Sequence, residues 1–119
     1  MSEPDFFILY VTDLQASCDF YSRLFDQELR PLSDYFATIK LSSGINFGLW
    51  KAEQAEPGLK IQGGSTEMVI PAGSAAEVDE RYHAWKAMGI NIQQPPVTLA
   101  FGYAFVATDP DGHRLRVLA

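Results

Sequence analysis

A pattern of one strand, one helix and three strands occurs twice along the chain, and this repeat constrains the fold more than any other feature of the sequence. The first copy starts with a strand predicted at 5–11, which is rich in aromatic and branched residues. A helix follows from Leu14 to Phe25, because apolar residues recur there on one helical face. Thr12 and Asp13 supply its N-cap. Three further strands are predicted at 27–32, 35–41 and 45–51.

The second half of the chain repeats this βαβββ order. A strand at 65–70 precedes a helix that starts at a capping box of Ser74 and Glu77 and ends at Gly89. The apolar face of this helix is expected at Val78, Tyr82, Trp85 and Met88. The last three strands are predicted at 90–94, 101–108 and 113–118, with a tight turn at 109–112 and a Pro95-Pro96 insertion.

The length of 119 residues fits one domain, and 47% hydrophobic with 20% charged residues is an ordinary composition for a folded chain. We therefore expect a single α+β domain made of two βαβββ modules, at about 4–52 and 62–119, joined by a polar linker. The two modules are expected to form a curved mixed sheet around a cleft, with the helices outside.

The charge balance argues against several classes of partner. The formal charge is -6, and no cluster of lysine and arginine offsets it, so nucleic acid is not an expected partner. The N-terminus is acidic where a signal peptide would be basic, and no apolar run approaches a membrane span. A cytoplasmic protein without a membrane partner is the expectation. The single cysteine, Cys18, is expected to be buried in the first helix.

Two motifs resemble those of the vicinal oxygen chelate superfamily, which groups glyoxalase I, bleomycin-resistance proteins and extradiol dioxygenases. The first is Val11-Thr12-Asp13-Leu14 leading to Phe20-Tyr21, and the second is Asp109-Pro110-Asp111-Gly112-His113. Together with Phe101-Gly102-Tyr103, the second motif looks most like phenazine antibiotic resistance proteins. That resemblance implies a homodimer with two clefts that bind planar aromatic antibiotics.

The resemblance also implies where metal-dependent members hold their metal, and three of these four positions carry residues that bind no metal. The positions correspond to Phe6, Gly48, Glu67 and Arg116. One carboxylate is too few to hold zinc or iron. We therefore expect no metal, no cofactor and no catalytic residue.

Alternation along each strand predicts which side chains share the cleft with these four positions. The cleft would then combine aromatic walls with a few polar groups, as small-molecule sites do. Tyr103 is a weaker candidate, because no motif fixes the parity of its strand. The predicted ligand-binding residues are Phe6, Tyr10, Asn46, Gly48, Trp50, Glu67, Tyr103 and Arg116.

The function predicted from these features is sequestration of a planar aromatic compound, such as a phenazine-like antibiotic, without a metal. Arg116 either binds a carboxylate of the ligand or pairs with Glu67, and the two interpretations do not exclude each other. The alternatives are a glyoxalase-like or dioxygenase-like enzyme of the same superfamily and a bleomycin-type binding protein. Arg114 and Arg116 on the cleft face argue against a cationic ligand such as bleomycin.

Overall fold

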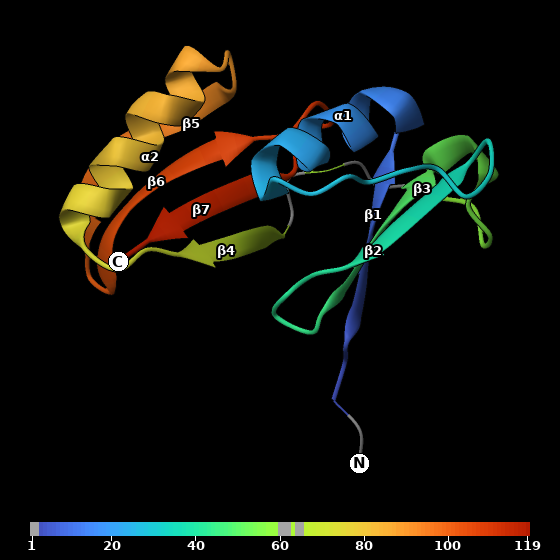
Figure 1. Cartoon of the computed structure of the whole chain (residues 1–119), viewed down its shortest axis with the longest axis horizontal. Helices are drawn as coiled ribbons and strands as arrows, with labels where there is room; N and C mark the ends of the chain where they lie inside the picture. Colours follow the sequence, from blue (N-terminus) through green and yellow to red (C-terminus); the bar gives the residue numbers. More distant parts are fainter. Residues whose placement is uncertain (1–2, 60–62, 64–65) are drawn as a thin grey trace. The chain divides into compact units, whose positions relative to one another are not determined.

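The computed structural model describes residues 3–59, 63 and 66–119, which form two compact units, Met1–Gln62 and Gly63–Ala119. Each unit pairs one α-helix with one β-sheet (Figure 1). The α+β class predicted from the sequence is confirmed. No helix within the described ranges is long and apolar enough to cross a membrane.

The first unit has a three-stranded sheet in the order β1-β3-β2. Strand β3 lies in the middle, parallel to β1 and antiparallel to β2. The helix α1 packs on one face of this sheet, where the rings of Tyr21 and Phe25 lie 4.8 and 5.2 Å from the ring of Phe47. The elements are β1 (Phe6–Val11), α1 (Leu14–Phe25), β2 (Phe36–Lys40), β3 (Asn46–Lys51) and a short 3₁₀ helix, η1 (Ala52–Gln54).

The strand predicted at 27–32 is wrong, since the segment forms only an isolated bridge between Pro31 and Ala37. The backbone N–H of Leu29 donates to the Ser22 hydroxyl at 2.9 Å, which ties this segment to α1 instead of to the sheet. Pro31 has no N–H to give to a strand ladder. The first unit is therefore βαββ in place of the predicted βαβββ.

The second unit has a four-stranded sheet in the order β4-β7-β6-β5, and the helix α2 lies across one of its faces (Figure 1). The rings of Tyr82 and Trp85 on α2 lie 5.6 and 5.3 Å from the ring of Phe105, which centres the core of this unit. Its elements are β4 (Glu67–Pro71), α2 (Ala75–Ala87), β5 (Asn91–Leu99), β6 (Gly102–Thr108) and β7 (Arg114–Leu118).

Strand β5 is longer than predicted, because it continues through Pro95 and Pro96. Proline is tolerated there because β5 is an edge strand, and two register shifts between Ile92 and Val97 interrupt its pairing with β6. The expectation for Met88 is also wrong. Met88 is the C-cap of α2 and is 38% exposed, whereas Val78 and Trp85 are buried as predicted.

The predicted caps and turns are confirmed. The side chain of Asp13 accepts from the N–H of Ala16 at 3.0 Å, and that of Ser74 accepts from the N–H of Glu77 at 3.2 Å. The Glu77 carboxylate accepts a hydrogen bond from the N–H of Gly73 instead of from that of Ser74. The arrangement is therefore a variant of the capping box. Gly112 closes the turn before β7 with φ +85°, a backbone conformation that favours glycine.

Candidate functional site

The helix-free face of the first sheet is aromatic. The register pairs Phe6 with Asn46, Ile8 with Gly48, and Tyr10 with Trp50, so these side chains share a face as predicted. Strand β2 adds Phe36, which is paired with Trp50. We call this surface the aromatic face; it consists of Phe6, Ile8, Tyr10, Phe36, Thr38, Lys40, Asn46, Gly48 and Trp50.

Trp50 is held between two other rings of the aromatic face. The Tyr10 ring lies 6.0 Å away at 34°, and the Phe36 ring lies 6.1 Å away at 86°. The indole Nε1 of Trp50 is buried and has no hydrogen-bond partner among the described residues. A buried indole N–H usually has an acceptor, so this unpaired donor is an unusual feature of the aromatic face.

Gly48 leaves no open space on the aromatic face. A Cβ at this position would lie 2.9 Å from Cε1 of Phe6 and 3.3 Å from Cγ1 of Ile8. The missing side chain is therefore what lets the Phe6 ring lie against the strand. Asn46, at the start of β3, donates through Nδ2 to the backbone oxygen of Asp5 at 3.3 Å.

The helix-free face of the second sheet is polar, and we call it the polar face. The register pairs Glu67 with Arg114, Val69 with Arg116, and Val106 with Arg116, which places all five side chains on it. The Arg116 guanidinium binds the Glu67 carboxylate through two hydrogen bonds, Nε to Oε1 at 2.8 Å and Nη2 to Oε2 at 3.2 Å. The predicted ion pair between these two residues is thus present.

This ion pair determines what Glu67 can do chemically. The hydrogen bond from Arg116 lowers the pKa of Glu67, which makes its carboxylate a weak general base. Arg116 itself stands at a position where the family resemblance implies another metal ligand. Within the described residues, no three His, Cys, Asp or Glu side chains lie together so that they could hold a metal ion.

Tyr103 faces the helix side of its sheet, contrary to the prediction. Its hydroxyl donates to Oδ1 of Asp79 on α2 at 2.7 Å, and this bond raises the pKa of Tyr103. The residue that the prediction missed is Phe101, whose ring lies 5.6 Å from Cζ of Arg116. Phe101 is 63% exposed, and its place in the Phe101-Gly102-Tyr103 motif, at the start of a predicted strand, was a signal for it in the sequence.

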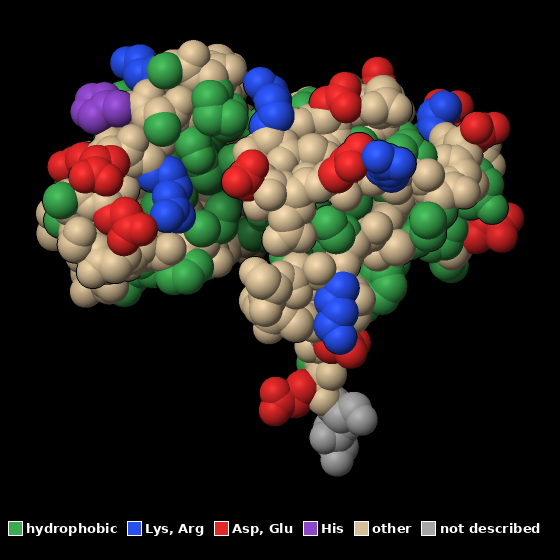
Figure 2. All heavy atoms as spheres, viewed as in Figure 1, with side chains coloured by type: hydrophobic (Ala, Val, Ile, Leu, Met, Phe, Trp, Pro, Cys, Tyr) green, Lys and Arg blue, Asp and Glu red, His purple; other side chains and the backbone are tan. Residues whose placement is uncertain are grey.

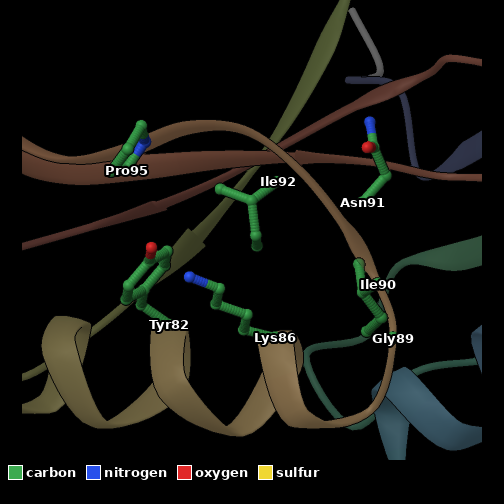
Figure 3. Close-up of a pocket in the computed structure, with 7 residues that line it drawn as sticks. All are labelled: Tyr82, Lys86, Gly89, Ile90, Asn91, Ile92 and Pro95. Carbon is green, nitrogen blue, oxygen red and sulfur yellow. The ribbon is translucent and has the colours of Figure 1, made fainter.

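Two hollows of the second unit are lined by described residues. The first, of about 280 Å³, lies on the polar face and is lined by Gln93, Gln94, Val106, Arg114 and Arg116. The second, of about 510 Å³, lies between α2 and β5, with Tyr82 and Lys86 opposite Ile92 and Pro95 (Figure 3). Its one charged group, the Lys86 ammonium, lies 5.7 Å from the centre of the Tyr82 ring. The smaller hollow therefore has more charged and hydrogen-bonding side chains, the groups that make binding selective.

Charged side chains of both signs are mixed on one face of the molecule. On the face shown in Figure 2, lysine and arginine side chains are scattered among acidic ones and form no continuous basic area. This distribution agrees with the formal charge of -6. On this face, the described residues form no continuous basic area of the kind that a nucleic-acid backbone requires.

Comparisons with known proteins agree with the two motifs. The chain is 30% identical over 117 residues to the phenazine antibiotic resistance protein EhpR of Enterobacter agglomerans, covering 96% of this chain and 89% of that protein. A protein of Agrobacterium tumefaciens solved by solution NMR is 41% identical, with a TM-score of 0.89 over 100% of this chain and 98% of the other.

A glyoxalase/bleomycin resistance protein/dioxygenase from Nocardioides is 25% identical, with a TM-score of 0.79 over 100% of this chain and 85% of the other. The family model of the Glyoxalase/Bleomycin resistance protein/Dioxygenase superfamily matches residues 4–117. That match spans nearly the whole sequence, and the chain therefore belongs to the Glyoxalase/Bleomycin resistance protein/Dioxygenase superfamily.

Proposed function

We propose that the protein binds and sequesters a planar aromatic small molecule without the help of a metal. The observation that carries this proposal is the setting of Trp50. Its ring is braced by Tyr10 and Phe36, and its Nε1 is a buried donor with no partner among the described residues. A braced indole offers a flat surface at little cost in conformational entropy.

The proposed ligand is a flat heteroaromatic compound of the phenazine type. Ring stacking contributes about 0.5–1.5 kcal/mol beyond the burial of apolar area. A ring nitrogen or ring oxygen at the ligand's edge would accept the hydrogen bond from Nε1 of Trp50. The similarity to a phenazine antibiotic resistance protein supports the same ligand class and a role in antibiotic resistance.

Binding without a metal is proposed from the residues present. Phe6, Gly48 and Arg116 stand where the family resemblance implies metal ligands, and none of their side chains binds a metal. The remaining carboxylate, that of Glu67, is engaged by Arg116. The same residues support a binding role over the enzymatic alternative.

The experiment is a calorimetric titration with phenazine in buffer that contains a chelator. The wild type should bind, and Trp50→Ala should weaken binding by about tenfold or more. Trp85→Phe is the matched control, because Trp85 packs on Phe105 in the core of the other unit. A loss of binding in the control equal to that in Trp50→Ala, or no binding by the wild type, would overturn the proposal.

We also propose that the protein forms a homodimer, as the family resemblance implies. Both sheets end in edge strands, β1 and β2 in the first unit and β4 and β5 in the second, and such edges favour association. Sedimentation equilibrium tests this directly. A mass near 13.2 kDa at all concentrations would contradict the dimer.

A further inference from the structure

The smaller hollow of the second unit presents four hydrogen-bonding side chains to one volume of about 280 Å³. Arg114 and Arg116 reach it from β7, and Gln93 and Gln94 reach it from β5. Consecutive residues of a regular strand point to opposite faces. Here the register shifts between Ile92 and Gln94, and this irregularity lets both glutamines line the same hollow.

Both arginines retain hydrogen-bonding capacity. Arg116 uses Nε and Nη2 for Glu67, while its Nη1 is buried without a partner among the described residues. The Arg116 side chain is only 13% exposed, so an unpartnered donor there is costly. Arg114 lines the same hollow, where its charge helps to lower the pKa of Glu67, and its guanidinium carries five N–H donors.

The charges around this hollow do not cancel. Arg114 and Arg116 contribute two positive charges, and Glu67 contributes one negative charge. One positive charge is therefore left over, in a protein whose formal charge is -6. A singly charged anion neutralises this excess, whereas a doubly charged one brings a surplus negative charge close to Glu67.

We propose that this hollow is a binding site for a small organic carboxylate. Two guanidinium groups and two side-chain amides are donors suited to the two oxygens of a carboxylate. Val106 supplies an apolar wall for the carbon skeleton of the anion. The site lies wholly within the second unit, and its existence does not depend on aromatic binding at Trp50.

The test is an NMR titration of the ¹⁵N-labelled full chain with benzoate, and with benzamide as its neutral isostere. Benzoate should shift the side-chain amide signals of Gln93 and Gln94 and the Nε signal of Arg114 in a saturable way. Benzamide should bind at least tenfold more weakly, because it lacks the charge-assisted hydrogen bonds. Shifts at these signals with equal affinity for both compounds, or no shifts with benzoate, overturn the inference.

Variants distinguish a specific binding site from a general effect of the protein's net charge. Arg114→Gln should weaken benzoate binding about tenfold, whereas Lys86→Gln, which removes the same charge on the helix side, should leave it unchanged. Gln93→Ala, on an exposed part of β5, should weaken binding severalfold and provides a second variant in case Arg114→Gln fails to fold. Equal weakening by Arg114→Gln and Lys86→Gln would show that only net charge matters and would overturn the site.

The outcomes also distinguish this inference from the proposed function. Benzoate binding at Gln93 and Gln94 without phenazine binding would leave the carboxylate site in place and remove the proposal for Trp50. Phenazine binding without benzoate binding would support the proposal for Trp50 and overturn the carboxylate site.

Discussion

Arg116 and Glu67 form a bidentate ion pair between the parallel strands β7 and β4, with Nε to Oε1 at 2.8 Å and Nη2 to Oε2 at 3.2 Å. The family resemblance implies a metal ligand at each of these positions. In this protein, the guanidinium supplies the positive charge that neutralises the Glu67 carboxylate. The pair therefore explains how a lone carboxylate is tolerated on the polar face.

The first prediction concerns the pH dependence of stability. Arg116 lowers the pKa of Glu67 below its unfolded value, so the pair stabilises the fold above about pH 4.5 and its contribution is lost as the pH falls through the folded pKa. Glu67→Gln should lower the free energy of unfolding at pH 7 by about 0.5–1 kcal/mol, because solvent partly screens the pair. Urea unfolding of both proteins at several pH values measures the difference. A difference that persists unchanged at pH 3 would contradict this account.

Gly48→Ala tests the close contact on the aromatic face. The added Cβ would lie 2.9 Å from Cε1 of Phe6, so the ring has to move. We expect a loss of about 1 kcal/mol in the free energy of unfolding. In a Phe6→Ala background most of this loss should disappear, because the obstructing ring is gone. An equal loss in both backgrounds, measured by urea unfolding, would rule out Phe6 as the cause.

The position of Tyr103 gives a prediction about both titration and binding. Because its hydroxyl donates to Asp79, the Tyr103 phenol should titrate above the usual tyrosine pKa in an ultraviolet difference titration. Tyr103→Phe should lower the urea midpoint and leave aromatic-ligand affinity unchanged. Tyr35→Phe, at a 45% exposed position, is the control for stability. Weaker ligand binding by Tyr103→Phe would show that Tyr103 is a ligand-binding residue and would contradict this account.

Much of the fold was predictable from local signals. Asp13, Ser74, Gly89 and Gly112 mark the caps and turns that the structure contains, because each role has a chemistry that few residues supply. Which side chains of β1 and β3 share a face was predictable from alternation, since the opposite parity is uniformly apolar and includes the buried Phe47 and Leu49.

The features that could not be predicted depend on interactions that a short stretch of sequence does not reveal. Segment 27–32 has strand-like residues, but its Leu29 N–H is bonded to Ser22 on the preceding helix. The face of Tyr103 depends on a contact with Asp79, 24 residues earlier in the chain. Gln93 and Gln94 share a hollow only because β5 has a register shift. Each of these depends on a tertiary contact or a strand irregularity.

The unpartnered indole N–H predicts a preference among flat ligands. Quinoxaline has ring nitrogens that accept a hydrogen bond, and naphthalene is the same shape without them. If Nε1 of Trp50 donates to the ligand, quinoxaline should bind roughly threefold to tenfold more tightly than naphthalene. Trp50→Phe should remove the preference while retaining a ring at this position. Equal affinities for the wild type in a calorimetric titration would show that the N–H plays no part.

The central claim, that Trp50 binds planar aromatic compounds, is tested most directly with one tryptophan in the chain. The protein has two tryptophans, and Trp85→Phe leaves Trp50 as the single reporter. Phenazine, added in the presence of a chelator, should quench the fluorescence of this variant in a saturable way at micromolar concentration. Quenching that rises linearly without saturation, or no quenching, would contradict the assignment of the aromatic face as the ligand-binding surface.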